Sequence, residues 1–266
     1  MEDPGAAHRP VVVVSGGHAY DADAFARMWN TIAPGRHTIF ARESLVSALD
    51  TALAQRAVLV LYDLSGIEVT RGEPIVVHDP PDDVVDSFAA LADAETPIRA
   101  MHHALASWPA WPHYAELLGG RFHYQPASLR GVPWPASGFR LDVAQHFSVA
   151  PTGSEHRVCV GLDRGIDLID EPYLCPVLDD TITVLMTTDA PREDAFYVPV
   201  DSSVAGNPDD RHGWRHPTGQ PAAVWSHEVD GARLVYVQPG HNASTFDDDG
   251  YRQLLTNSLA WLSEIG

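Results

Sequence analysis

Short apolar runs alternate with helix-period stripes through the first hundred residues. The run Val11–Val14 consists only of β-branched residues, and apolar side chains then recur every three to four positions from Phe25 to Ile32. Such runs are typical of strands buried on both faces of a parallel sheet, and the later spacing is that of an amphipathic helix. The same alternation continues through strands predicted at His37–Ala41, Val58–Tyr62 and Pro97–Met101. This order predicts a doubly wound α/β fold with right-handed crossovers.

The middle of the chain is less regular. Residues 107–180 are rich in Trp, Pro and Gly, and they predict a helix at Trp111–Leu118 and a strand pair within Phe139–Val149. Another strand is predicted at Thr181–Thr187. For the long segment 188–221 two hypotheses stay open: a lid over a site, or the contact of a homodimer.

A hairpin and a helix end the pattern. Apolar segments flank Asp230-Gly231, and this dipeptide suits a two-residue β-hairpin turn. The stripe Tyr251–Leu262 predicts the last helix, with a core-facing side. Because no repeat or linker interrupts the chain, we expect one domain over residues 9–265 and a disordered N-terminal tail over residues 1–8.

The charged residues narrow the function classes. All 17 basic residues are Arg, so the chain offers no ε-amine for a Schiff base and no Lys for a phosphate-binding loop. The formal net charge is −19. A surface of this sign repels phosphate backbones and anionic lipids, so we expect neither nucleic acid nor a membrane as partner.

The cysteines and the N-terminus indicate the compartment. Two cysteines, Cys159 and Cys175, are too few for a disulfide scaffold. The first ten residues, MEDPGAAHRP, lack the apolar segment of a signal peptide, and no apolar run approaches the roughly 18 residues of a membrane span. We therefore expect a cytoplasmic protein.

Polar residues follow the predicted strands at the end where α/β proteins bind ligands. His18 follows the first strand, Asp63 the third, His102 and His103 the fourth, and His241 the final one. Any one of these could be a strand-end residue that only bonds to neighbouring loops. Taken together, they predict a functional edge of the sheet.

Several familiar arrangements are absent from the sequence. There is no G-x-S-x-G motif and no Cys after the fourth strand, so a Ser or Cys nucleophile is not expected. The first strand leads into Gly16-Gly17 and not into G-x-G-x-x-G, so no nucleotide cofactor is expected. No H-E-x-x-H zinc motif occurs either.

Two further groups of residues have alternative interpretations. Asp170-Glu171 is a pair of carboxylates, but on an extended segment adjacent side chains point to opposite faces, so only one faces a site. Trp108 and Trp225 either stack on the apolar faces of a sugar or cover the sheet as part of the core.

Segments spread over nearly the whole chain resemble, in the right order, the ThuA family, named for trehalose utilisation. The resemblance rests on the following segments: Gly16-Gly17-His18; His102-His103-Ala104; Trp111-Pro112-His113-Tyr114; Leu117–Phe122; His156 with Gly161-Leu162; Ile166–Tyr173; and Val224-Trp225 through Arg233–Tyr236 to Gly240-His241 and Tyr251–Trp261. Three positions depart from the family pattern: the turn Asp230–Arg233, Asn242, and Arg157 after His156.

The resemblance implies a three-layer, flavodoxin-like fold of the class I glutamine amidotransferase type, with a mostly parallel central sheet and a C-terminal hairpin. In amidotransferases a Cys occupies the turn after the central strand. Here His102 or its neighbour stands at that place, and His241 is similar in place to the triad His. Glutaminase activity is therefore not implied.

The resemblance also implies a role in the metabolism of carbohydrates, namely disaccharides or their keto derivatives. We hypothesise an enzyme using His and carboxylate acid–base chemistry; the alternative is a non-catalytic sugar-binding or assembly module. The hypothesis takes His102, His241 and Glu171 as catalytic residues. It assigns substrate binding to His18, Asp63, His103, Trp108 and Trp225. For a divalent metal such as zinc, the hypothesised ligands are His18, His102 and His241.

Overall fold

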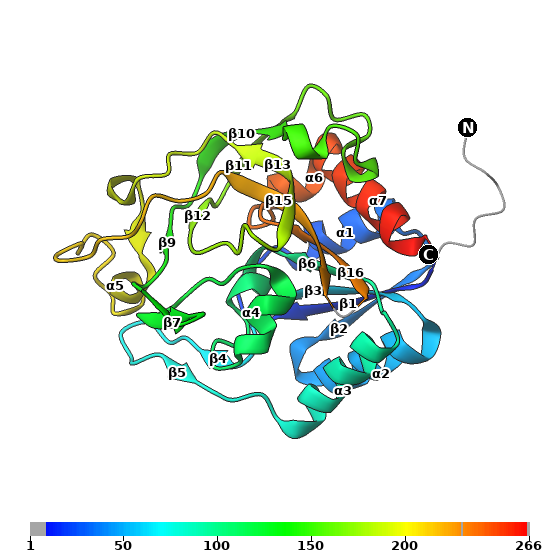
Figure 1. Cartoon of the computed structure of the whole chain (residues 1–266), viewed down its shortest axis with the longest axis horizontal. Helices are drawn as coiled ribbons and strands as arrows, with labels where there is room; N and C mark the ends of the chain where they lie inside the picture. Colours follow the sequence, from blue (N-terminus) through cyan, green and yellow to red (C-terminus); the bar gives the residue numbers. More distant parts are fainter. Residues whose placement is uncertain (1–8, 230, 265–266) are drawn as a thin grey trace.

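A nine-stranded sheet forms the centre of the molecule in the computed structural model, which describes residues 9–229 and 231–264 (Figure 1). The residues of the predicted tail, Asp230 of the hairpin turn, and residue 265 lie outside the described part. In sheet order the strands are β11 (Ile166–Asp170), β10 (Val143–Val149), β13 (Ile182–Thr188), β15 (Ala222–Val229), β16 (Ala232–Val237), β6 (Ile98–Met101), β3 (Val58–Asp63), β1 (Val11–Gly16) and β2 (His37–Ala41).

The sheet has a parallel half and an antiparallel half. Strands β16, β6, β3, β1 and β2 run parallel to one another, and β15, β13, β10 and β11 continue the sheet with antiparallel pairings. The predicted α/β fold is confirmed, as is the C-terminal hairpin, which consists of β15 and β16. Across its full width the sheet is mixed, and the parallel order holds at its core.

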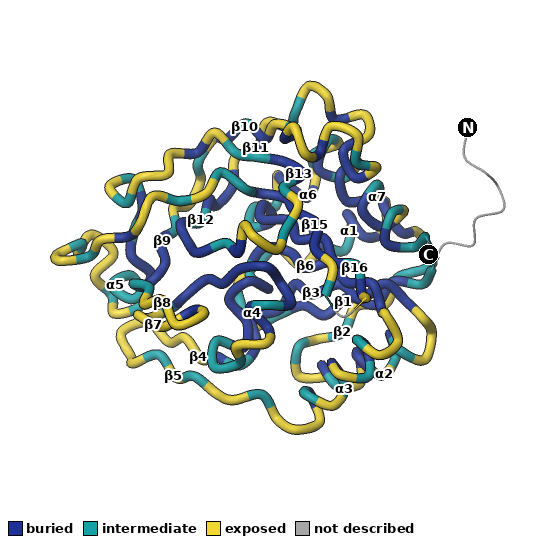
Figure 2. The backbone as a smooth tube through the Cα atoms, viewed as in Figure 1, coloured by how far each residue is buried: buried dark blue, intermediate teal, exposed yellow. Residues whose placement is uncertain are grey.

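Helices cover both faces of the sheet and make three layers. One face carries α1 (Ala22–Ile32), α6 (Ala243–Asp247) and α7 (Asp249–Ser263), and the other carries α2 (Leu45–Gln55), α3 (Asp82–Asp93) and α4 (Pro112–Leu118). The period-2 alternation of a strand explains the two cores, because Val11 and Val13 pack under α1 and α7 while Val12 and Val14 pack under α2. Figure 2 shows the central strands buried between these helices.

The helix ends are capped by the residues that the local sequence offers. Asp21 accepts a hydrogen bond from the Ala24 amide at 2.8 Å and caps α1. Asp248 accepts one from the Tyr251 amide at 2.8 Å and caps α7. Carboxylates at these positions satisfy free amides and interact favourably with the helix dipole.

Smaller elements lie beyond the carboxyl ends of the parallel strands, on the side away from the C-terminus (Figure 1). They comprise one three-stranded sheet, two two-stranded sheets and a short helix: β12 (Tyr173–Leu174), β9 (Gly138–Phe139) and β14 (Val198–Pro199); β4 (Ile67–Glu68) with β5 (Val76–Val77); β7 (Ala127–Leu129) with β8 (Val132–Trp134); and α5 (Val200–Val204).

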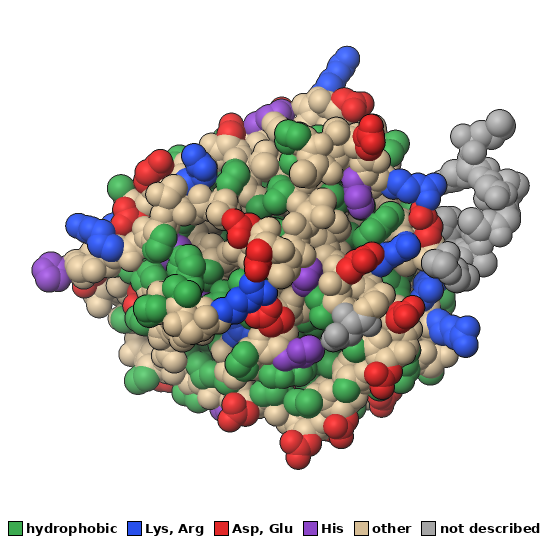
Figure 3. All heavy atoms as spheres, in the orientation of Figure 1, with side chains coloured by type: hydrophobic (Ala, Val, Ile, Leu, Met, Phe, Trp, Pro, Cys, Tyr) green, Lys and Arg blue, Asp and Glu red, His purple; other side chains and the backbone are tan. Residues whose placement is uncertain are grey.

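The surface reflects the acidic composition. On the face in Figure 3, acidic side chains are spread over many elements and are interrupted by apolar and Arg side chains. None of the helices in the described residues combines the length and apolar character needed to cross a bilayer.

Candidate active site

Polar side chains gather where the carboxyl ends of the strands meet. His102 and His103 begin a short 3₁₀ helix directly after β6, and His241 follows β16, its parallel neighbour. Glu171 follows β11 at the far edge of the sheet, yet its segment returns to the same place. These four side chains each place one nitrogen or carboxylate oxygen within 4.8 Å of all the others. We refer to His102, His103, Glu171 and His241 as the His–Glu cluster.

The contacts within the His–Glu cluster are short. Glu171 Oε2 lies 2.9 Å from His102 Nε2 and 3.1 Å from His241 Nδ1, and the two imidazole nitrogens are 3.4 Å apart. The Tyr173 hydroxyl lies 3.0 Å from both His102 Nε2 and His103 Nδ1. Five polar groups therefore share one small volume.

His102 is held by its backbone and by its second ring nitrogen. Its φ is +46°, in the left-handed region that costs a non-glycine residue about 1 kcal/mol or more. Its Nδ1 lies 2.8 Å from the Gln238 carbonyl oxygen, and its own carbonyl accepts a hydrogen bond from the Tyr236 hydroxyl at 3.0 Å. Because a carbonyl only accepts, Nδ1 carries the proton and Nε2 faces the cluster.

Asp170 supports the loop that carries His241. It is fully buried and accepts hydrogen bonds from the backbone amides of Gly240 and His241, each at 3.1 Å, and from the Thr245 hydroxyl. The two adjacent carboxylates thus have separate tasks: Glu171 faces the imidazoles, and Asp170 fixes the backbone beside them.

The surroundings shift the pKa values of the cluster in opposite directions. Burial acts to raise the pKa of Glu171, but hydrogen bonds to His102 and His241 outweigh it and lower that pKa to about 2. Burial acts to lower the pKa of His241, and the hydrogen bond and charge of Glu171 raise it overall. Burial, reinforced by the other histidines, holds the pKa of His103 well below its ordinary value.

His18 lies beside the His–Glu cluster without joining it. Its ring packs 4.2 Å from that of His103, between centroids, but its Nε2 lies 2.9 Å from the Tyr62 carbonyl oxygen and its Nδ1 lies 3.3 Å from that of Ala19. Burial lowers its pKa to about 4. In place of the predicted ligand set with His18, the structure gathers the three other histidines and Glu171.

Asp63 and Trp108 face the other core. Tyr62, the residue before Asp63, packs in the layer of α1, so alternation turns Asp63 toward the layer of α2 and α3. There Ser65 donates a hydrogen bond to Asp63 Oδ2, and Oδ1 has no partner among the described residues. Burial raises the pKa of Asp63 to about 6. Trp108 is buried in the same layer, where its backbone amide donates to the Ser65 carbonyl at 2.8 Å.

Trp225 is part of the core as well. It is 1% exposed, its ring lies 4.2 Å from that of Tyr236 between centroids, and its Nε1 donates to the Leu118 carbonyl at 2.8 Å. Of the two interpretations of Trp108 and Trp225, the structure supports core packing over an open stacking platform.

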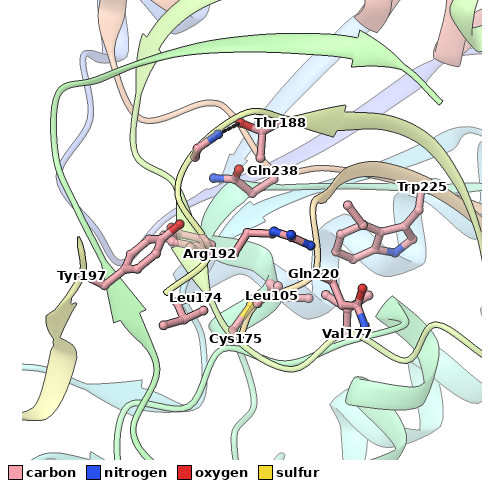
Figure 4. Close-up of a pocket in the computed structure, with 14 residues that line it drawn as sticks. Leu105, Leu174, Cys175, Val177, Thr188, Arg192, Tyr197, Gln220, Trp225 and Gln238 are labelled. Atoms are coloured by element: carbon pink, nitrogen blue, oxygen red, sulfur yellow. Dashed lines mark hydrogen bonds between the residues drawn. The ribbon is translucent and has the colours of Figure 1, made fainter. Parts of the chain in front are cut away.

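A small cavity lies next to the His–Glu cluster. Figure 4 shows the side chains that line it. Tyr173 and Gln238, which contact the cluster, also line this cavity, together with Trp225, Tyr197 and Arg192. About 20 Å³ is open to the centre of a water molecule, which is room for roughly one water and not for a sugar ring. The more accessible side of the cluster is the one where His103 and His241 lie, both half-buried.

Sequence reasoning assigned no role to Tyr173 and Gln238. The signal for Tyr173 was its spacing, because residues two apart on an extended segment share a face, and Glu171 is two residues earlier. Gln238 acts through its backbone carbonyl, which lies 2.8 Å from His102 Nδ1, and through its side-chain amide, which donates to the Glu171 carbonyl; no local sequence pattern reveals either contact.

The fold and site together define a three-layer α/β protein with a cluster of His and Glu side chains at the carboxyl ends of its strands. The family model of ThuA, described as trehalose utilisation, matches residues 11–262, and the chain belongs to this family.

Solved structures agree with this fold. A protein described as ThuA-like from Parabacteroides merdae aligns over 96% of this chain and 90% of its own, with 13% identity and a TM-score of 0.64. Another from Bacteroides uniformis aligns over 98% and 94%, with 15% identity and a TM-score of 0.64. At these identities the likeness shows the fold alone. A search of curated proteins gives no match.

Proposed function

We propose that the chain is an enzyme of carbohydrate metabolism whose reaction takes place at the His–Glu cluster and Tyr173. The observation that carries this proposal is the convergence of three imidazoles and one carboxylate within 4.8 Å. Buried polar groups cost folding free energy, so such a concentration is typical of functional sites. The family description, trehalose utilisation, supports a sugar as substrate, and we propose a disaccharide or its keto derivative.

The cluster has a buried part and an accessible part. His102 and Glu171 are buried, whereas His103, His241 and Tyr173 are half-buried and border the approach to the site. A sugar oxygen placed beside the Tyr173 hydroxyl would lie within reach of His103 Nδ1. His103 then exchanges a proton with this sugar oxygen. Glu171 and His241 form a charged pair behind His103, and this pair stabilises the charge that develops on the sugar oxygen.

Cysteine chemistry does not enter the proposal. Burial raises the pKa of Cys159 to about 11 and that of Cys175 to about 12, so both remain thiols at neutral pH. Neither belongs to the His–Glu cluster.

The test is turnover by purified protein of a panel of disaccharides and their keto derivatives, with products identified by mass spectrometry. His103→Gln is expected to lower kcat by about 100-fold or more, since general acid–base groups contribute on this scale. His212→Gln, on an exposed loop, is the matched control and is expected to change nothing. His102→Ala and His241→Ala follow, with circular dichroism as the check on folding.

Two results would contradict the proposal. If all three cluster variants kept full turnover, the reaction would take place elsewhere. If sugars bound with no conversion by any variant or by the parent protein, the chain would be a binding module.

A further inference from the structure

Three side chains of the His–Glu cluster each bring one nitrogen or oxygen atom within 3.4 Å of the other two. His102 Nδ1 donates to the Gln238 carbonyl, so the neutral ring presents the lone pair of Nε2 toward Glu171 Oε2, only 2.9 Å away. His241 Nδ1 approaches the same oxygen at 3.1 Å. The single proton of the Tyr173 hydroxyl can satisfy only one of its neighbours. Acceptor atoms this close repel unless a proton or a metal ion lies between them.

The distances between these atoms fit a metal ion. In a tetrahedral zinc site with bonds of about 2.0–2.1 Å, neighbouring ligand atoms lie about 3.3–3.4 Å apart, and in an octahedral site about 3.0 Å apart. The three separations here are 2.9, 3.1 and 3.4 Å. The three ligand atoms therefore form a triangle close in size to one face of a zinc coordination polyhedron.

The surroundings of these ligands are also those of a metal site. A histidine that binds a metal usually donates its other ring N–H to a carbonyl or carboxylate, as His102 does to Gln238. Asp170 fixes the backbone of His241 through its amide at 3.1 Å. Glu171 is held as well, because the side-chain amide of Gln238 donates to its carbonyl. The three ligands thus come from the ends of three different strands, and each has a partner outside the cluster.

We propose that His102 Nε2, Glu171 Oε2 and His241 Nδ1 bind one zinc ion and leave one position open toward His103 and Tyr173. Two imidazoles and one carboxylate are a ligand set typical of catalytic zinc, in which the remaining position takes water or substrate. Binding of the ion stands on the geometry of the ligands. Its use in catalysis rests on the proposed function, in which it would polarise the sugar oxygen that exchanges a proton through His103.

The experiment is zinc titration of the full chain, expressed without a His-tag, stripped with a chelator and dialysed. Isothermal titration calorimetry and elemental analysis are expected to give one zinc per chain. His241→Gln is expected to weaken zinc binding by 100-fold or more, and Glu171→Gln by a similar factor. His103→Ala is expected to keep one equivalent with affinity changed less than about fivefold, because it borders the site and is not a ligand.

A second histidine–carboxylate pair provides the matched control. His146 Nδ1 lies 2.7 Å from Asp167 Oδ1 on the exposed edge of the sheet, with no third ligand beside them in the described residues. His146→Gln should leave both stoichiometry and affinity as in the parent chain. Cobalt binding gives an independent readout that needs no activity, since a tetrahedral site of this kind has visible absorption that His241→Gln abolishes.

The outcomes separate this inference from the proposed function. Zinc below 0.2 equivalents, or affinity that His241→Gln leaves unchanged, overturns the metal site. If turnover then persists in chelator but not in His103→Gln, the proposed function stands without a metal. If one zinc binds through the three ligands and no sugar is ever converted, the metal site stands and the proposed function fails.

Discussion

Glu171 and Asp63 are both buried carboxylates at the carboxyl ends of strands, but their surroundings differ. Glu171 lies between two imidazoles, at 2.9 and 3.1 Å. Asp63 lies in an apolar layer, where Ser65 bonds to one of its oxygens and the other has no partner among the described residues. At the same depth of burial, one carboxylate is therefore stabilised as an anion and the other is penalised. The neighbours, and not the burial, decide where charge is kept.

The two carboxylates give the free energy of unfolding opposite slopes with pH. The pKa of Glu171 falls from 4.5 to about 2 on folding, so its stabilisation is complete above pH 4.5 and is lost as the pH falls toward 2. The pKa of Asp63 rises from 3.8 to about 6, so its penalty grows as the pH rises between these values and is constant above them.

The largest effect is expected for Glu171→Gln. This change keeps the side-chain size but leaves the imidazoles without their anion, and breaking a buried pair costs about 3–5 kcal/mol of unfolding free energy. Under the proposed function, turnover of the sugar should also fall by about 100-fold or more. Urea unfolding followed by circular dichroism measures the first effect.

The control is Asp167→Asn, which removes the carboxylate partner of the exposed His146. An exposed pair contributes about 0–1 kcal/mol, so this variant should be close to the parent chain. Equal losses of unfolding free energy in Glu171→Gln and Asp167→Asn would mean that the buried Glu171 pair stabilises the fold no more than an exposed pair does.

Asp170→Asn is expected to lower the free energy of unfolding by about 2–3 kcal/mol. The amide cannot reproduce the charged acceptor of the Gly240 and His241 backbone amides, and hydrogen bonds to charged groups contribute on this scale. Hydrogen exchange should localise the loosening to residues 240–245. Uniform loss of protection over β11 and β16 alike would show that Asp170 supports the whole edge and not this loop.

Much of the fold was open to prediction because the parallel core has an unambiguous pattern. Val11–Val14 and Val58–Tyr62 are buried on both faces, and their runs of apolar residues mark them directly. In α/β proteins ligands bind at the carboxyl ends of the strands, and we call this the strand-end rule. It led to His102, His103 and His241, because the neighbouring parallel strands β6 and β16 end side by side. The family resemblance supplied the order of the remaining elements.

The rest of the site depends on contacts between distant segments. Glu171 follows β11, which is four places from β16 in the sheet, so its arrival beside His241 cannot be read from local pattern. The direction of Asp63 follows from the alternation after Tyr62, a signal that the strand-end rule alone does not use. His18 was predicted as a metal ligand because it follows the first strand at the same edge of the sheet. Its Nε2 instead lies 2.9 Å from the Tyr62 carbonyl oxygen, outside the His–Glu cluster.

Asp63→Asn is expected to stabilise the protein at pH 7 by about 1–3 kcal/mol, because it removes a charge whose pKa burial raises to about 6. At pH 4 the folded parent chain already carries a neutral Asp63, so the gain should nearly vanish. Urea unfolding at pH 4, 5.5 and 7 measures this slope. A variant that is equally destabilised at all three values would show that Asp63 is an acceptor that the fold needs in its charged form.

The smallest effect is expected for Ser65→Ala. The hydroxyl of Ser65 donates to Asp63 Oδ2, so its removal leaves the carboxylate less well solvated and raises the pKa of Asp63 further. At pH 7 this should cost about 1 kcal/mol, and at pH 4 less, because a neutral carboxyl depends less on the donor. The same substitution in the Asp63→Asn background should cost under about 0.5 kcal/mol at either pH. If the cost of Ser65→Ala were independent both of pH and of the residue at position 63, the hydroxyl would serve the backbone of the turn, and the contrast between the two carboxylates would rest on Glu171 alone.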